Sequence, residues 1–178
     1  EDYIRAGATM LEDHEEVINA SKVVIKVKEP TIAECKLLKP HQVLFCYLHL
    51  AAFPEQTRLL CESGVTAIGY ETVSTSDGQL PLLKPMSQIA GRLAVQNAVH
   101  FLQKHEGGRG VLMSGVGGVE RGKILIIGGG TAGENAALVG VGLGAEVTVF
   151  DKSLARLDYL ADKFGSNLNY VYPTNKAY

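Results

Sequence analysis

A glycine-rich segment in the second half of the sequence has the residue types that bind nucleotide phosphates. Residues 128–133 read Gly-Gly-Gly-Thr-Ala-Gly, which places Gly128, Gly130 and Gly133 in the pattern Gly-x-Gly-x-x-Gly. The first glycine permits a tight turn, the second lets the backbone approach a pyrophosphate, and the third lets the following helix pack closely on the strand. The N-terminus of that helix then offers N–H groups and a partial positive charge to the phosphates.

An acidic residue follows this loop at the distance expected of a dinucleotide site. Asp151 lies 23 residues after Gly128, close to the usual offset of about 20. A carboxylate there accepts hydrogen bonds from both ribose hydroxyls and repels a 2′-phosphate, so the sequence predicts NAD rather than NADP. The alternative is a glycine-rich turn in a structural α/β unit with an incidental aspartate. Arg156, one turn beyond Asp151, lies either near the adenosine ribose or on a solvated helix face.

A lysine and a histidine form a second candidate constellation. Lys28 ends a predicted strand of residues 23–28, and His49 lies near the end of the next, residues 43–50. Neighbouring parallel strands would bring both side chains to one sheet edge, where open α/β sheets bind ligands. A lysine there suits a small carboxylate, and an imidazole can move a proton near neutral pH. Lys26 is the competing lysine, and the alternative interpretations are a solvated lysine and a hydrogen-bonded core histidine.

Alternating strands and helices are needed to position these residues. In the first part, Thr31 and Glu34 have the spacing of a helix capping box, and Gly64 closes a second helix. Short β-branched runs separated by helical patterns predict an α/β fold with Rossmann-like parallel sheets. The expected strands are residues 23–28, 43–50 and 65–70, and the expected helices are residues 31–38 and 54–61.

The second part begins with a long helical pattern, residues 88–105, for which Ser87 is the expected N-cap. Its apolar residues lie on more than one face, which is typical of a connector buried on several sides. Around the glycine loop we expect a strand at residues 123–127, a helix at 134–142 and a strand at 146–150. The predicted organisation is a partial substrate domain, residues 1–81, and a connecting helix plus a partial nucleotide-binding domain, residues 82–178.

Composition excludes several classes of protein. The 178 residues are 46% apolar. With 17 basic and 19 acidic residues, the sequence lacks the excess of positive charge that is typical of nucleic-acid-binding proteins. No apolar run approaches the ~20 residues of a membrane span. The three cysteines, Cys35, Cys46 and Cys61, lack metal-ligand spacing and cannot all pair, which favours a reducing compartment and no metal site.

Several motifs together resemble one enzyme family. They are residues 26–30 (KVKEP), 48–51 (LHLA), 69–72 (GYET), 82–91 (LLKPMSQIAG), 107–112 (GGRGVL) and the glycine loop. In this order and spacing they are similar to alanine dehydrogenase, and the similarity covers essentially the whole chain. Related families are the NAD-binding α subunit of proton-translocating transhydrogenase and the saccharopine-type dehydrogenases.

The resemblance implies an enzyme that converts L-alanine reversibly to pyruvate and ammonium, with NAD as hydride acceptor. It implies that Lys28 holds the substrate carboxylate and carbonyl region and that His49 is the general acid/base. It further implies a cytoplasmic homohexamer. It assigns Ser87 to the cofactor, Thr131 and Ala132 to its pyrophosphate, and Asp151 to its adenosine ribose. Arg156 is a further basic residue that it places against the cofactor.

The same resemblance implies that parts of the enzyme lie outside these residues. The family's substrate-binding arginine would precede Glu1, and its catalytic aspartate would follow Tyr178, so we expect an internal fragment that is poorly soluble or inactive alone. Near Pro173 and Thr174, where the family offers a hydroxyl to the cofactor, no residue is assigned. The rival hypotheses are a transhydrogenase subunit and a non-catalytic NAD-binding module.

Overall fold

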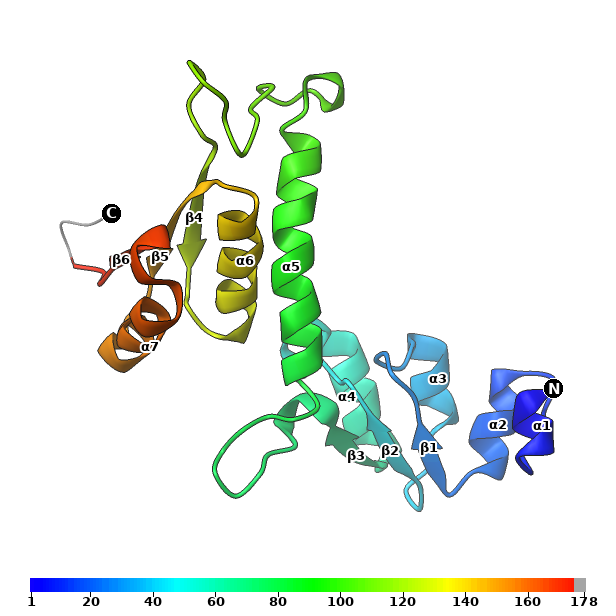
Figure 1. Ribbon diagram of the computed structural model, residues 1–178. Coiled ribbons are helices and arrows are strands. Elements are labelled where there is room, and N and C mark those ends of the chain that lie inside the picture. The colour runs from blue at the N-terminus through cyan, green and yellow to red at the C-terminus, as the bar shows by residue number, and fades with distance from the viewer. Residues whose placement is uncertain (175–178) are drawn as a thin grey trace. The chain divides into compact units, whose positions relative to one another are not determined.

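The computed structural model describes residues 1–174 and divides into two compact units, Glu1–Leu83 and Lys84–Tyr178 (Figure 1). The first unit contains a parallel sheet of order β1-β2-β3, and the second a parallel sheet of order β4-β5-β6. Helices connect successive strands within each sheet, as parallel pairing requires. The predicted α/β fold with Rossmann-like parallel sheets is therefore confirmed.

In the first unit, local sequence signals fix the helix ends. Thr31 Oγ1 accepts the Glu34 N–H at 3.2 Å, and Glu34 Oε2 accepts the Thr31 N–H at 2.6 Å, so the predicted capping box is present. Gly64, with φ of +68°, closes α4. The elements are α1 (Asp2–Arg5), α2 (His14–Ala20), β1 (Val23–Ile25), α3 (Ile32–Leu37), β2 (Val43–Cys46), η1 (Leu50–Ala52), α4 (Pro54–Ser63), β3 (Thr66–Gly69) and η2 (Tyr70–Thr72).

Strands β1 and β2 are shorter than the sequence predicted. Backbone pairing continues briefly past them, with the Tyr47 N–H donating to the Val27 carbonyl at 3.1 Å. The chain then leaves the sheet, and the next N–H groups, those of Leu48 and His49, donate to the carboxylate of Glu71 and not to a neighbouring strand. Lys28 and His49 consequently lie in the segments that follow the strands and not within them, which corrects the predicted strand ends.

The core of the first unit lies between its sheet and helices, and Leu44 of β2 is only 1% exposed. Two cysteines belong to this core: Cys35 and Cys46 are buried, whereas Cys61 on α4 is exposed. Burial raises the pKa of the Cys46 thiol to about 11 and also raises the pKa of Cys35. The buried thiols thus behave as small apolar side chains.

In the second unit the predicted strands β4 and β5 have the expected bounds, but two helix starts differ. Helix α5 begins at Lys84, so Ser87 lies in its first turn and is not the N-cap; Pro85 is compatible with a first turn, where its missing N–H costs nothing. Helix α6 begins at Thr131, with Gly130 as N-cap. The elements are α5 (Lys84–Phe101), η3 (Lys104–Glu106), β4 (Lys123–Ile127), α6 (Thr131–Gly142), β5 (Glu146–Phe150), α7 (Leu154–Phe164), η4 (Gly165–Asn167) and β6 (Asn169–Val171).

Helices α5 and α6 pack side by side in this unit (Figure 1). A Cβ on Gly91 of α5 would lie 2.0 Å from the carbonyl oxygen of Ala132, so a glycine is required where the two helices meet. A separate apolar core, which includes Val149 and Leu160, each 0% exposed, lies beneath α6 and α7. This packing holds the N-terminus of α6 rigidly beside the glycine loop.

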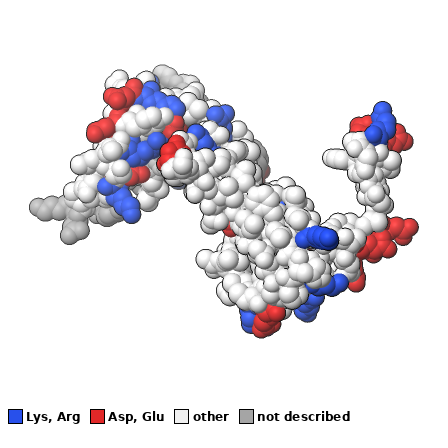
Figure 2. Space-filling view, turned by 90° about the horizontal axis from the view of Figure 1, so that it is seen from below, with Lys and Arg blue, Asp and Glu red and all other residues white. Residues whose placement is uncertain are grey.

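The surface carries charges of both signs. On the face shown in Figure 2, Lys and Arg side chains lie next to Asp and Glu side chains, and most of the visible surface belongs to other residue types. Several large apolar side chains are exposed on the sheets, among them Ile25 and Ile127, at 68% and 75%. Within residues 1–174, no helix is both long enough and apolar enough to cross a membrane.

Candidate functional site

The glycine loop connects β4 to α6 and forms an open cradle. Gly128 has φ of +99°, a conformation that favours glycine, and its N–H donates to the Phe150 carbonyl at 2.8 Å. A Cβ on Gly133 would lie 1.9 Å from the Gly128 carbonyl oxygen, so only glycine lets α6 start this close to the loop. A Cβ on Gly130 would meet nothing within 4 Å, which leaves that side of the loop open.

Helix α6 presents its N-terminus at this opening. Its N-cap, Gly130, provides no side-chain hydrogen bond to the first turn. The N–H groups at the start of a helix have no partner within the helix, and the helix dipole adds a partial positive charge there. Thr131 and Ala132 form this first turn, so the two residues that the resemblance assigned to a pyrophosphate lie at the anion-binding end of α6.

Asp151 follows β5 and lies against the glycine loop. Its Oδ2 accepts the Gly129 N–H at 2.6 Å, and its Oδ1 accepts the Ser153 N–H at 2.8 Å. The hydrogen bond from Ser153 lowers the pKa of this carboxyl, and with the bond from Gly129 it outweighs the opposing effect of burial. An ionised carboxylate is thereby fixed at the tip of the second strand, where a ribose hydroxyl donor would meet it.

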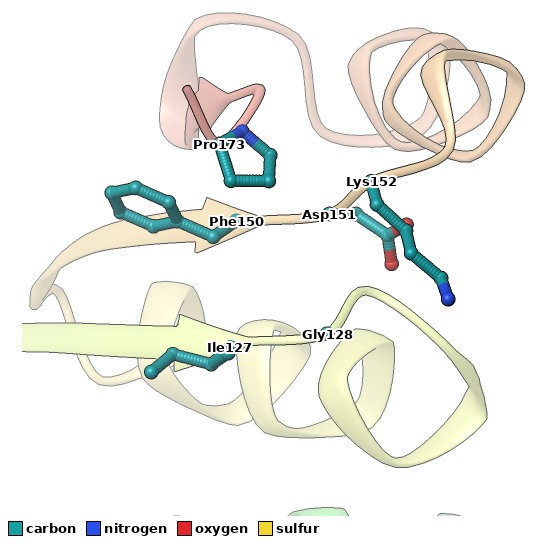
Figure 3. A pocket seen from close by; sticks show the side chains of 6 residues that line it. All are labelled: Ile127, Gly128, Phe150, Asp151, Lys152 and Pro173. Atoms are coloured by element: carbon teal, nitrogen blue, oxygen red, sulfur yellow. The ribbon is translucent and has the colours of Figure 1, made fainter. Parts of the chain in front are cut away.

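A pocket of about 250 Å³ lies beside Asp151, at the carboxyl ends of β4 and β5 (Figure 3). The side chains of Ile127, Phe150 and Pro173 line one side of it, and Asp151 and Lys152 line the other (Figure 3). Open α/β sheets bind ligands at this edge. An apolar wall next to a carboxylate suits a flat base joined to a ribose, so the residues present fit the adenosine end of a dinucleotide.

Arg156 on α7 is engaged and does not project freely into solvent. Its Nε donates to the Gly129 carbonyl, and its Nη2 pairs with Glu134 Oε2. Its guanidinium carbon lies 4.6 Å from the centre of the Tyr159 ring. Of the two positions that the sequence left open for Arg156, the structure places it at the glycine loop, next to Asp151.

A second pocket, of about 440 Å³, lies between the first turns of α5 and α6 and helix α7. Thr131 contributes to its wall, and half-buried Ser87 stands next in sequence to a lining residue, Gln88. The lining is mostly polar and charged. It consists of Lys84, Gln88, Thr131, Glu134, Asn135, Arg156, Tyr159 and Lys163.

In the first unit, His49 follows β2 in an unusual backbone conformation. Its φ of +48° lies in the left-handed region, which is strained for a residue with a side chain. Glu71 Oε1 accepts the His49 N–H at 2.8 Å, and both carboxylate oxygens accept the Leu48 N–H, at 3.0 and 3.2 Å. Partial burial opposes ionisation of Glu71, but hydrogen bonds from the backbone N–H groups of Glu71, His49 and Leu48 outweigh it and lower its pKa. Glu71 therefore holds His49 in place.

The segment after β1 runs beside His49. Glu29 Oε2 lies 3.9 Å from His49 Nε2, is buried, and has no hydrogen-bond partner among the described residues. Lys28, the neighbour of Glu29, is exposed. Lys26 donates to both oxygens of Glu34 at 2.7 Å, so its ammonium is already paired with a carboxylate. The structure thus brings the Lys28 and His49 segments to one sheet edge and removes Lys26 as the competing lysine.

Sequence reasoning missed two carboxylates at this edge, Glu29 and Glu71. Glu29 lies four residues after the end of β1 and Glu71 two residues after the end of β3, and they belong to the motifs KVKEP and GYET. Their position after strands was the signal that could have identified them. In the part of the chain that the structure describes, no three His, Cys, Asp or Glu side chains gather as a metal site would require.

Among solved structures, the chain is similar in sequence and fold to one enzyme and similar in fold alone to another. The structure of an L-alanine dehydrogenase matches with a TM-score of 0.83 and 49% identity, over 97% of this chain and 48% of that one. A transhydrogenase from Sinorhizobium meliloti matches with a TM-score of 0.69 and 22% identity, over 96% of this chain and 49% of that one. The second likeness concerns the fold only.

The sequence comparisons are consistent with this result. An alanine dehydrogenase from Methanococcus maripaludis is 49% identical over 168 residues, which are 94% of this chain and 45% of that protein. The chain thus spans about half the length of the curated relatives it matches. The family model of the alanine dehydrogenase/PNT N-terminal domain matches residues 1–90, and that of the C-terminal domain matches residues 94–178. The chain therefore belongs to the alanine dehydrogenase/PNT family, as its motifs predicted.

Proposed function

We propose that the full-length protein is an oxidoreductase that converts L-alanine reversibly to pyruvate and ammonium with NAD as cofactor. The observation that carries this proposal is the 49% identity to an alanine dehydrogenase over 94% of the chain. The residues at both sheet edges support it, because one edge has the groups for a nucleotide and the other has those for a small amino acid. In this proposal residues 1–81 belong to the substrate domain and residues 82–178 to the nucleotide domain.

The nucleotide domain would hold the cofactor through the glycine loop and α6. The N-terminus of α6, with Thr131 and Ala132, would bind the pyrophosphate, while Gly128 and Gly130 leave room for it and Gly133 lets α6 start close to the loop. Asp151 would accept hydrogen bonds from the adenosine ribose, with Arg156 beside it, and Ser87 would contribute from α5. When bound, the nicotinamide supplies the acceptor for the hydride that leaves the substrate carbon.

The substrate domain would bind the amino acid and move its protons. The ammonium of Lys28 would pair with the substrate carboxylate, and its exposure leaves that charge available. The imidazole of His49 would be the general acid/base. It would accept and donate protons at the groups bound to the nitrogen-bearing carbon while the amine is converted to a carbonyl. Glu71 holds the His49 backbone, and Glu29 Oε2 stands 3.9 Å from His49 Nε2, on the same sheet edge.

The substitution His49→Ala in the full-length protein tests this proposal. We expect kcat for alanine-dependent NAD reduction to fall by at least about 100-fold, the lower range for loss of a general acid/base, while the Kd for NAD changes little. The control is His41→Ala, which removes another exposed histidine of the same unit. Spectrophotometric rates and nucleotide titration give both quantities.

Two results of this experiment would contradict the proposal. A His49→Ala protein that retains its alanine-dependent rate would remove His49 from the chemistry. A parent protein that binds NAD but shows no reaction with alanine would favour a transhydrogenase subunit or a non-catalytic module. Following the family resemblance, we also propose a cytoplasmic homohexamer, which the molecular mass in solution and cell fractionation test.

A further inference from the structure

One face of α7 converges on a single carboxylate of α6. Arg156, Tyr159 and Lys163 stand at positions i, i+3 and i+7, so they share one side of the helix. Glu134 Oε1 accepts from Lys163 Nζ at 2.5 Å and from the Tyr159 hydroxyl at 3.4 Å, and Glu134 Oε2 pairs with Arg156 Nη2. With 16% of its side chain exposed, Glu134 is the most buried member of this group.

The same arginine lies at the peptide that Asp151 binds. Arg156 Nε donates to the Gly129 carbonyl, while Asp151 Oδ2 accepts the N–H of that residue. Two groups of opposite charge therefore approach Gly129 from its carbonyl and its amide. Because Asp151 stands where a ribose would bind, the guanidinium of Arg156 stands next to the position that a 2′-phosphate would occupy.

We propose that Glu134 is a determinant of cofactor selectivity, because it pairs with the guanidinium of Arg156, which would otherwise be available to a 2′-phosphate. This inference rests on the proposed nucleotide-binding function of the second unit. In dinucleotide-binding folds an arginine near the ribose accommodates the 2′-phosphate of NADP. Here such an arginine is present, but the partly buried carboxylate of Glu134 accepts from its outer nitrogen, Nη2.

The electrostatics of the group support this assignment. Partial burial opposes ionisation of Glu134, but hydrogen bonds from Lys163 and Arg156 outweigh it and lower its pKa. Glu134 is therefore ionised at neutral pH, the form that pairs with Arg156 and Lys163. Without the Glu134 carboxylate, the guanidinium of Arg156 would keep its bond to Gly129, while its Nη2 would lose its charged partner and prefer a phosphate oxygen.

The test is the substitution Glu134→Gln in the full-length protein, with NAD⁺ and NADP⁺ as probes. We expect the Kd for NADP⁺ to fall by about tenfold relative to the Kd for NAD⁺, because Arg156 gains one charge-assisted hydrogen bond to the 2′-phosphate. Adding Arg156→Ala to this variant should abolish the gain. Fluorescence titration or calorimetry measures both Kd values without any dependence on catalysis.

Glu146→Gln is the matched control. Glu146 is a half-exposed carboxylate in the same unit, at the opposite end of β5, where it lies 3.9 Å from Lys123. Its substitution removes the same charge and should leave the ratio of the two Kd values unchanged. If Glu134→Gln is unstable, Glu134→Ala removes the carboxylate while keeping high helix propensity in α6 and should shift the ratio in the same direction.

The outcomes separate this inference from the proposed function. A folded Glu134 variant whose Kd ratio is unchanged, or whose gain persists without Arg156, overturns the inference while NAD⁺ binding by the parent still supports the proposed function. A parent that binds neither nucleotide overturns both. A ratio that shifts equally in the Glu146→Gln control also overturns the inference, because the effect would then come from net charge alone.

Discussion

A single carboxylate holds the backbone around His49. The left-handed φ of His49 costs about 1–3 kcal/mol for a residue with a side chain, and surrounding contacts must compensate for it. Glu71 does so by accepting the N–H groups of both Leu48 and His49. The residue that carries the proposed proton transfer thus depends on a second residue, 22 positions later in the chain, which does not need to touch the substrate.

We expect Glu71→Ala to destabilise the first unit by about 1–3 kcal/mol, because two backbone donors lose their acceptor. The alanine-dependent rate should fall, with the Kd for NAD unchanged, because His49 loses its fixed position. Denaturant unfolding and steady-state kinetics measure the two effects. Glu62→Gln on α4, which breaks an exposed pair with Arg58, is the control and should change stability by less than about 1 kcal/mol.

The same contact has a pH dependence with a defined sign. The pKa of Glu71 in the folded protein lies below its ordinary value of 4.5, so its ionised form stabilises the fold above that pH. This contribution disappears as the pH falls through the folded-state pKa. The stability difference between the parent and Glu71→Ala should therefore be constant near neutral pH and shrink below pH 4.5; a difference that grows on acidification would contradict this role.

At the scale of elements, the start of α6 is fixed by close backbone contact. Gly133→Ala would place a methyl group 1.9 Å from the Gly128 carbonyl oxygen, and neither backbone segment can move without displacing the loop. We expect a loss of about 1–3 kcal/mol in stability and a strong loss of nucleotide affinity. Gly142→Ala, at the other end of the same helix, meets nothing within 4 Å and should be neutral or stabilise by up to about 1 kcal/mol. Comparable effects at both glycines would show that helix propensity, and not the contact with the Gly128 carbonyl, determines the change in stability.

The accuracy of sequence interpretation also differs between elements. Strands β4 and β5 have the predicted bounds because each is a continuous apolar or β-branched run that ends at a glycine or an acid. The predicted ends of β1 and β2 were wrong. For β2 the cause is Glu71, whose carboxylate accepts the backbone N–H groups after the strand and which lies 22 residues beyond His49 in the chain. The position of Arg156 depended likewise on Glu134, a contact across 22 residues that no local pattern indicates.

At the scale of the whole chain, each unit has its own apolar core. Leu44 and Leu160 are 1% and 0% exposed, and they belong to separate clusters of buried residues, one in each unit. Leu44→Ala should destabilise the first unit and Leu160→Ala the second, each by about 2–5 kcal/mol. Amide hydrogen exchange resolved along the sequence measures both, and equal loss of protection in both units from either substitution would show that they unfold as one.

The three cysteines of the first unit differ in their accessibility to thiol reagents. Cys35 and Cys46 are buried and their thiols resist deprotonation, whereas Cys61 is exposed on α4. Thiolates, not thiols, react with maleimides and similar reagents. The native fold therefore offers Cys61 as an attachment point for a fluorophore or spin label. The rate at which the two buried thiols react then measures how often the first unit opens.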